Sequence, residues 1–410
     1  MNSVRVTFQL ILLAALAGTT GCMELSEVRP SPFGDGQPGS TPGTLANKPA
    51  GETRTTRVKT QVLPLGFVPY DNLTLPLISP DGRYVATQTG IAPTWETVLA
   101  QPEAGVPYAT RIEIYEVPQR WGDNPNLKHA LDEPVLLGRA CDIEGFLIEA
   151  PQEDGSRWIG RVNWQTGELQ WLVRDDAVNA FANLGPADRL AWSRRAVDGE
   201  HFDLVVRRDT YKFTIASTGN DWLMPTWSKR DDGMFVLSLS GGFLDLTYAV
   251  ASTPQAFAQS TQKLVLNRVD ASRREAYQTL VNHVTIADGP VPAHDQLTFF
   301  YPRYARTVIW RPLSGSSRPL TVLHADSYAA ILTEDGHALT ATEEALFLQN
   351  LEDLKDTAEL MAGVLVPRLT PTGDWPLMLL ETEEGRVALT ALRLLPQDAS
   401  VEELLELETR

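Results

Sequence analysis

Apolar and polar residues alternate in short segments along most of the chain, and the clearest example follows a tight turn. The stretch Ser79–Ala86 reads Ser-Pro-Asp-Gly-Arg-Tyr-Val-Ala. Pro80 presets φ, the side chain of Asp81 can hydrogen-bond the backbone ahead of it, and Gly82 supplies a positive φ. Alternation with a period of two is typical of a strand with one buried face. We therefore expect a turn followed by a strand.

Strand and hairpin patterns recur downstream at intervals of about 40 residues, the length of a four-stranded propeller blade. Weaker copies of the turn-and-strand unit precede most of them. The predicted strands are Arg111–Val117, Trp158–Trp164 with Leu169–Val173, Phe202–Val206 with Tyr211–Ile215, Phe243–Tyr248, Thr307–Trp310 with Leu320–Leu323, Leu346–Gln349 with Thr357–Met361, and Val387–Leu395. This series predicts an all-β chain of about seven blades, with six to eight possible.

One longer interval in this series contains two helical patterns, Pro254–Leu266 and Ser272–Val284. In the second, apolar residues recur four positions apart on one face. We expect a small helical insertion between blades, at about residues 252–286. The segment Ala345–Met361 also fits a helix, but the blade spacing favours strands.

A propeller closes when a strand from one terminus completes the blade formed by the other. Two segments are candidates for this strand. Arg57–Leu63 alternates correctly for an edge strand, and Val401–Leu407 at the C-terminus suits either an outer strand or a short helix.

The octapeptide Ser79–Ala86 resembles the repeat signature of TolB-like and related WD-repeat-like propellers of the bacterial envelope. The resemblance is strong over this octapeptide, and the spacing extends it across residues 61–395. It implies a six- to eight-bladed propeller that binds partners and has no chemistry of its own, because the family has no general catalytic motif. The alternative is another all-β fold with frequent Asp-Gly turns, such as a pair of sandwiches.

The first residues have the pattern of a processing signal. Arg5 precedes the apolar segment Thr7–Ala17, which is shorter than the roughly 20 residues needed to span a bilayer. Gly21 and Cys22 follow. This arrangement resembles a bacterial lipoprotein signal, in which the cysteine is lipidated and becomes the new N-terminus. Thr19 departs from the aliphatic residue usual in that family, and an ordinary cleaved signal peptide is the alternative.

These patterns divide the chain into three parts. Residues 1–21 are the predicted signal peptide, and residues 22–60 combine the lipid-anchor cysteine, Cys22, with a tether rich in Pro, Gly, Ser and Thr. Residues 61–410 form the predicted propeller domain. Several acyl chains on Cys22 would anchor the chain stably where one would be marginal.

The charge of the chain restricts its partners. The 410 residues carry a formal net charge of −17 and the sequence pI is about 4.8. An acidic surface repels phosphate backbones and anionic lipid headgroups, so we expect no nucleic-acid partner and no broad electrostatic docking on membranes. The membrane contact we expect is through the N-terminal lipid alone.

Catalytic and metal-binding motifs are absent from the sequence. The closest approach to a nucleophile elbow is Ser238–Gly242, which reads better as a strand and a turn. The six histidines are scattered without metal-ligand spacing, so no metal or cofactor is expected. Cys141 stands beside Asp142 and Glu144, whose charges disfavour a thiolate, and is expected to be a small buried apolar residue.

Tryptophan is frequent, with ten residues, and three of them fall in one predicted hairpin. Aromatic side chains can fill the wedge between blades, or they can form a surface that binds sugars or peptides together with loop carboxylates. The residues in question are Trp158, Trp164 and Trp171 in the hairpin, and Trp192, Trp222 and Trp227 near predicted turns.

The sequence therefore predicts a lipid-anchored protein of the cell envelope that faces the periplasm. Its propeller would bind a protein or a cell-wall glycan without catalysis of its own. The alternative is a periplasmic or secreted propeller hydrolase that acts on glycans or peptides. A pocket lined by convergent carboxylates, or by a Ser/His pair, would favour the hydrolase.

Overall fold

The chain divides into two compact units, Met1–Pro49 and Ala50–Arg410, and the residues described here all belong to the second. The structure is a computed structural model. It describes residues 58–69, 76–91, 109–118, 123–185, 187–208, 211–228, 232–240, 243–268, 297–301, 306–310, 320–322, 329–332, 337–342, 345–362, 366–368, 377–381 and 386–396. Cys22 and the predicted signal peptide lie outside these residues.

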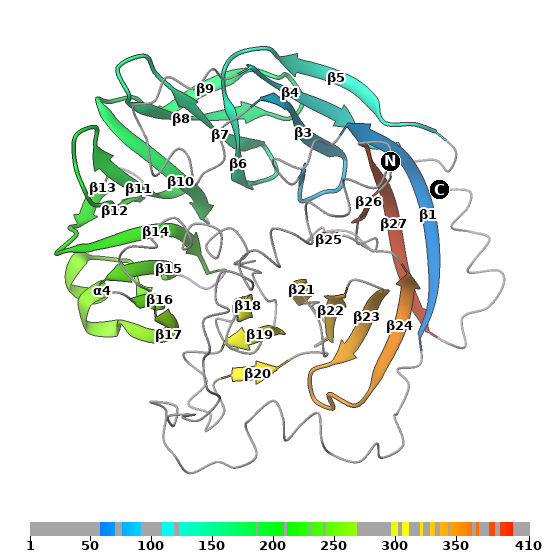
Figure 1. Ribbon diagram of the computed structural model, residues 1–410. Coiled ribbons are helices and arrows are strands. Elements are labelled where there is room, and N and C mark those ends of the chain that lie inside the picture. Colours follow the sequence, from blue (N-terminus) through cyan, green and yellow to red (C-terminus); the bar gives the residue numbers. More distant parts are fainter. Residues whose placement is uncertain are drawn as a thin grey trace, which may run out of the picture. The chain divides into compact units, whose positions relative to one another are not determined.

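Strands that follow one another in sequence pair antiparallel into sheets (Figure 1). The first sheet contains β2 to β5. The next combines two meanders, β6–β9 and β10–β13, which are joined by a single parallel bridge between Val178 and Arg157. The strands are β2 (Leu77–Ile78), β3 (Tyr84–Ile91), β4 (Ala109–Glu116), β5 (Asn126–Leu131), β6 (Leu136–Cys141), β7 (Gly145–Pro151), β8 (Arg157–Asn163), β9 (Leu169–Val173), β10 (Ala177–Gly185), β11 (Arg189–Ala196), β12 (Asp203–Arg208) and β13 (Tyr211–Ile215).

The second half of the domain continues this pattern. The sheets contain β14 to β17, β18 to β20, β21 to β24, and β25 to β27 with β1 from the N-terminal side. The strands are β14 (Asn220–Trp227), β15 (Gly233–Ser240), β16 (Phe243–Val250), β17 (Gln262–Arg268), β18 (Leu297–Tyr301), β19 (Arg306–Trp310), β20 (Leu320–Val322), β21 (Ala329–Leu332), β22 (His337–Ala341), β23 (Ala345–Asn350), β24 (Thr357–Ala362), β25 (Val366–Arg368), β26 (Leu377–Glu381), β27 (Arg386–Pro396) and β1 (Val58–Pro69).

Contacts between successive sheets run through the whole domain and return to the start. β6 contacts β3 and β10, β10 contacts β14, β18 contacts β21, β21 contacts β25, and β1 contacts β3. The rings of Phe235 and Trp310, 5.8 Å apart, join the β14–β17 sheet to the β18–β20 sheet. Consecutive antiparallel meanders that close on themselves define a β-propeller. The predicted fold class is confirmed, and the count of about seven blades stays a prediction.

The N-terminal strand β1 closes this series of sheets. It pairs antiparallel with β27 from Val58 opposite Pro396 to Pro69 opposite Arg386. The first of the two closing segments considered, Arg57–Leu63, therefore overlaps the strand that closes the fold. Val401–Leu407 lies outside the described residues. The strand begins at Val58, before the predicted domain boundary at residue 61.

The outer strands predicted from the sequence are present. They correspond to β4, β8, β9, β12, β13, β16, β19, β20, β23, β24 and β27. In the segment Ala345–Met361, where a helix was the alternative, the structure has β23 and β24. Blade spacing was the better guide there because these residues pair with β22 on one side and with each other on the other.

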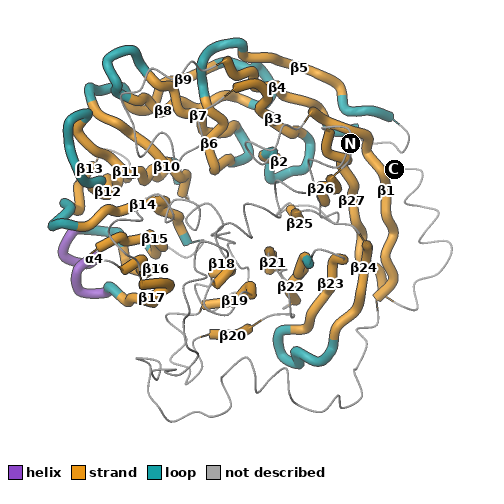
Figure 2. The backbone as a smooth tube through the Cα atoms, viewed as in Figure 1, coloured by secondary structure: helices purple, strands orange, loops and turns teal. Residues whose placement is uncertain are grey.

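The predicted helix Pro254–Leu266 is correct only in its first half. The helix α4 spans Pro254–Ser260, with Thr253 accepting a hydrogen bond from the backbone of Ala256 as its N-cap (Figure 2). After it, β17 pairs with β16 as the fourth strand of the same sheet. The helix therefore joins two strands of one sheet and does not separate two blades. The second predicted helix, Ser272–Val284, lies outside the described residues.

The turn at Ser79 has the predicted geometry. Gly82 has φ of 69°, and its amide donates to the carbonyl oxygen of Ser79 at 2.8 Å. Asp81 Oδ1 accepts from the amide of Arg83 at 3.1 Å and from Ser79 Oγ at 2.7 Å. The buried Ser79 Oγ also accepts from the amide of Tyr84 at 2.9 Å, so the turn is tied to the first residue of β3.

The domain core lies between neighbouring sheets. One cluster joins Ile112 and Ile114 of β4 to Phe146 and Ile148 of β7, with Trp164 packed among them. Each strand thus contributes alternate residues to the seam on either side of its sheet. Similar clusters fill the seams that follow, so the stability of one sheet depends on its neighbours.

We predict that Gly82→Val destabilises the protein by about 1–3 kcal/mol, because a β-branched residue is strained at a positive φ. Asp81→Ala should cost about 0.5–1.5 kcal/mol, the value of a local hydrogen bond. Gly82→Asn is the matched control, since asparagine tolerates a positive φ. Thermal melts of the three variants test this order, and a Gly82→Val protein that melts with wild type would contradict it.

Candidate functional site

Four of the tryptophans singled out in the sequence fill the seams between sheets. Trp164 is 1% exposed, and its indole nitrogen donates to the carbonyl oxygen of Asp142 at 2.8 Å. Trp192, Trp222 and Trp227 are also buried in clusters of apolar side chains. Packing therefore accounts for these four residues.

Trp158 and Trp171 are different, because both are only partly buried. Their rings meet edge to face, with centroids 5.5 Å apart and planes at 82°. The exposed guanidinium of Arg174 lies 4.2 Å from the centre of the Trp158 ring. Gly160 lies between Trp158 and Val162 on the same side of β8, which leaves room for the side chain of Leu169. These three residues, Trp158, Trp171 and Arg174, are called the Trp–Arg cluster below.

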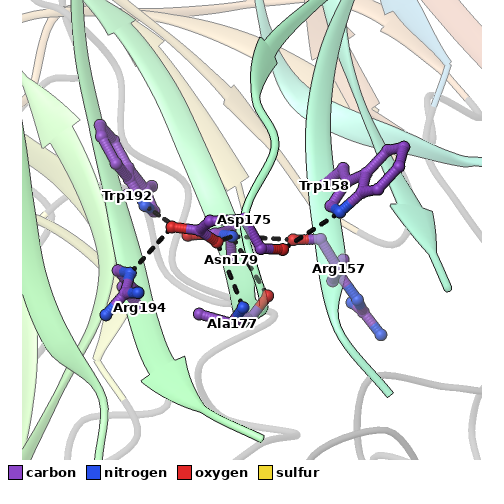
Figure 3. A network of polar contacts seen from close by, with 7 residues as sticks. All are labelled: Arg157, Trp158, Asp175, Ala177, Asn179, Trp192 and Arg194. Atoms are coloured by element: carbon purple, nitrogen blue, oxygen red, sulfur yellow. Dashed lines mark hydrogen bonds and ion pairs between the residues drawn. The ribbon is translucent and has the colours of Figure 1, made fainter. Parts of the chain in front are cut away.

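A polar network centred on Asp175 supports the Trp–Arg cluster (Figure 3). The backbone carbonyl oxygen of Asp175 accepts from Trp158 Nε1 at 3.1 Å. Its carboxylate accepts from Asn179 Nδ2 at 2.6 Å, from the amide of Ala177 at 3.2 Å and from Arg194 Nε at 3.2 Å. One short segment between β9 and β10 thus receives donors from β8, β10 and β11.

Asn179, the third residue of β10, extends this network into the core. Its side-chain nitrogen also donates to the carbonyl oxygen of Arg157 at 2.9 Å, and its oxygen accepts from Trp192 Nε1 at 2.8 Å (Figure 3). The bonds cross from β8 to β11 at the point where the two meanders are joined by their parallel bridge. A buried amide whose donors and acceptor are all used fixes the relative position of these strands.

A second buried group, the ion pair of Glu149 and Arg157, connects β7 and β8 to β10, the first strand of the next meander. Arg157 Nη1 donates to Glu149 Oε2 at 3.1 Å, and the side chains are 5% and 3% exposed. Glu149 Oε1 accepts from the amide of Phe181 at 2.8 Å. Phe181 has φ of 56° at a bulge in β10, a conformation that costs energy for a non-glycine residue.

The pKa directions of the two carboxyl groups differ. Burial raises the pKa of Glu149, although the charge of Arg157 and the amide of Phe181 oppose this effect. At Asp175, burial acts in the same direction, but the hydrogen bonds from Asn179 and Arg194 outweigh it and lower the pKa. Both carboxylates accept hydrogen bonds from the chain itself. This arrangement builds a rigid support for the Trp–Arg cluster.

Other residues considered in the sequence have structural contacts. His129 Nε2 lies 2.7 Å from the carbonyl oxygen of Gln165, and His201 Nδ1 lies 3.4 Å from Asp221 Oδ1. Cys141 is partly buried and its Sγ is 3.3 Å from the carbonyl oxygen of Ile78, so it is less buried than expected. Among the described residues, no three His, Cys, Asp or Glu side chains gather as a metal site. Cys22 lies outside the described residues, so its lipidation stays a prediction.

Asp175, Asn179 and Glu149 were not predicted as site residues from the sequence. One signal was available for Asn179, because β10 reads Ala-Val-Asn-Ala-Phe-Ala-Asn-Leu-Gly and asparagine is depleted in strands. Glu149 sits similarly in the apolar strand β7. Polar residues inside apolar strands would have indicated buried partners, but not which ones.

No helix within the described ranges is long and apolar enough to cross a membrane.

No protein-family model matches the chain, and no curated protein matches it. Among solved structures, TolB from Acinetobacter baumannii is 9% identical to this chain, with a TM-score of 0.36. The match covers 71% of this chain and 79% of the TolB chain. The Dos1 propeller has 10% identity and a TM-score of 0.43, covering 68% and 73%. A prolyl endopeptidase has 11% identity and a TM-score of 0.43 over 80% of this chain, which spans 47% of that enzyme.

We predict that Asp175→Asn lowers stability at neutral pH and that the difference from wild type shrinks in acid. Because the folded protein lowers the pKa of Asp175, its contribution is present above the usual value of 3.8 and is lost as the pH falls through the folded pKa. Chemical denaturation at neutral pH and at stepwise lower pH measures this difference. Asp176→Asn, on the exposed neighbouring residue, is the control. A gap that stays constant with pH would contradict the assignment.

Proposed function

We propose that this protein is anchored to a membrane of the bacterial cell envelope by a lipid on Cys22, and that its propeller faces the periplasm. The signal pattern that ends at Gly21 and Cys22 supports the anchor. The predicted tether leads directly into β1, the strand that closes the propeller. These features favour a folded binding domain that a flexible tether connects to its membrane anchor.

We further propose that the propeller acts by binding a protein or a cell-wall glycan, without catalysis of its own. The observation that carries this proposal is the Trp–Arg cluster, which combines partly exposed aromatic rings with an exposed guanidinium on a rigid support. Tryptophan and arginine dominate the energetics of many protein interfaces. The indole of Trp158 is held before binding by its hydrogen bond to Asp175, which Asn179 in turn positions, and this lowers the entropic cost of association.

The lipid anchor predicts a labelling result. Cells that express the wild-type chain should incorporate labelled palmitate into it, and cells that express Cys22→Ala should not. Cys141→Ala is the matched control, because it removes the other cysteine of the chain and should leave labelling unchanged. Equal labelling of wild type and Cys22→Ala would end the lipoprotein proposal.

If the propeller binds a cell-wall glycan without catalysis, the protein should sediment with the glycan and release no soluble product. The full chain in detergent is mixed with purified cell-wall sacculi, and the pellet and the soluble fragments are measured in the same tube. Retention in the pellet without release of sugars or peptides supports a glycan-binding role. Release of soluble fragments would instead establish the hydrolase that the sequence left as its alternative.

A further inference from the structure

The Trp–Arg cluster contains two hydrogen-bond donors that the chain itself does not use. The guanidinium of Arg174 is exposed and lies 4.2 Å from the centre of the Trp158 ring, but it makes no hydrogen bond or ion pair with the described part of the chain. The indole nitrogen of Trp171 has no hydrogen-bond partner there either. Trp158 differs, because its nitrogen already donates to the carbonyl oxygen of Asp175 (Figure 3). The cluster is therefore fixed at Trp158 and has unused donors at Arg174 and Trp171.

Arg174 differs in this respect from many arginines elsewhere in the described ranges, which form ion pairs with Asp or Glu side chains. These paired residues are Arg111, Arg157, Arg161, Arg189, Arg194 and Arg208. Arg174 packs on an aromatic ring instead, and such a contact leaves the N–H groups at the edge of a guanidinium available for hydrogen bonds. The planar fork of these groups matches the two oxygens of one carboxylate.

The carboxylates that follow Arg174 in the sequence do not take up these N–H groups. Asp175 Oδ1 accepts from Asn179 Nδ2, and Asp175 Oδ2 accepts from Arg194 Nε. Asp176 is exposed, and no hydrogen bond or ion pair joins its side chain to Arg174. Arg194 therefore balances the charge of Asp175, whereas no carboxylate among the described residues is bonded to Arg174.

The charged groups around β9 balance one another, unlike those of the chain as a whole. Arg207 of β12 donates to the carbonyl oxygen of Leu172 in β9 at 2.9 Å, and the charge of Asp188 acts on this guanidinium. The contacts around β9 and the start of β10 bring together as many guanidinium groups as carboxylates, namely Arg174, Arg194 and Arg207 against Asp175, Asp176 and Asp188. Charges farther away are largely screened beyond about 8 Å at physiological ionic strength. An acidic group can therefore approach Arg174 although the chain has a net charge of −17.

The two unused donors limit the chemistry of the ligand. A guanidinium and an indole N–H only donate, so they need a ligand group that accepts. A carboxylate does this with both oxygens, whereas sugar hydroxyl groups also donate and would find no free acceptor in the cluster. The guanidinium also lies over the Trp158 ring, where a sugar ring would otherwise stack. The exposed parts of the two indoles suit an apolar side chain.

We infer that the Trp–Arg cluster binds a peptide segment in which an acidic residue lies next to an apolar one. The carboxylate accepts hydrogen bonds from the guanidinium of Arg174, and the apolar side chain packs against the indoles of Trp158 and Trp171. Trp171 Nε1 donates to a carbonyl oxygen of the same segment. The inference rests on the proposed binding role and names its ligand, and it is independent of the lipid on Cys22.

The test begins with a phage-displayed library of random peptides about twelve residues long, which is selected on the full chain in detergent. We expect the selected peptides to share an Asp or Glu beside an aromatic or aliphatic residue. A selected peptide is then synthesised in its acidic form and in a form with the corresponding amide, and both are titrated by fluorescence anisotropy. The amide form should bind at least about tenfold more weakly, because hydrogen bonds between charged groups are among the stronger ones.

Variants of the cluster connect this affinity to its side chains. Arg174→Gln should weaken binding of the acidic peptide at least about tenfold and remove the difference between the two peptide forms. Arg174→Lys keeps the charge but loses the planar fork, so it should restore only part of the affinity. Trp171→Phe keeps an aromatic ring and removes the second donor, which should cost about fivefold. Asp176→Asn is the matched control, because it changes the charge of an exposed neighbour and should not weaken binding.

Selected peptides without an acidic residue, or equal binding of the acidic peptide by wild type and Arg174→Gln, would overturn the inference, and so would a failure to select any peptide. Glycan strands freed of their stem peptides form the second arm of the test. If wild type binds these strands and Arg174→Gln does not, the cluster binds a glycan, so the peptide inference is wrong while the proposed binding role stands. If neither peptides nor glycan strands bind, the proposed binding role is wrong as well.

Discussion

The pairing of β1 with β27 is the constraint on which the rest of the fold depends. A series of sheets that each contact the next would otherwise leave one open strand edge and one open seam. The pairing extends from Val58 opposite Pro396 to Pro69 opposite Arg386, so the two ends of the domain are joined along nearly their whole length. At the bulge, Gly66 has φ of 91° and lies against Asn124 and Pro125, which directly precede β5 of the first sheet. Closure therefore sets the register of the last sheet and its contact with the first.

Hydrogen bonds between strands of neighbouring sheets then set how each pair of sheets packs together. Gln88 Oε1 accepts from the amide of Leu137 at 2.6 Å, and Asn183 Oδ1 accepts from the amide of Trp227 at 3.1 Å. Both join one sheet to the next and replace water on a buried backbone group. Apolar packing alone is non-directional, whereas each of these bonds requires one register. Each of these two pairs of sheets therefore has its own hydrogen bond that fixes how the sheets pack.

Alternation and turn residues predicted the strands well because both are local signals. The turn at Gly82 and the paired strands β8 and β9 follow directly from their own residues. The residues Gln262–Leu266 were wrongly predicted as helix, because only their pairing with β16 makes them part of a strand. The Asp175 network was missed for the same reason. Its partners come from three different strands, β8, β10 and β11, and no local pattern shows which strands lie beside one another.

Asp175 and Asp245 show how the surroundings of a carboxyl group change its pKa. At Asp175 the chain supplies donors for the carboxylate, and these hydrogen bonds lower its pKa despite partial burial. At Asp245, Oδ1 accepts no hydrogen bond from the described residues and Oδ2 lies 3.9 Å from Lys263 Nζ, and burial raises the pKa. Donors from neighbouring strands therefore decide whether a buried carboxyl group joins those strands or costs the fold free energy.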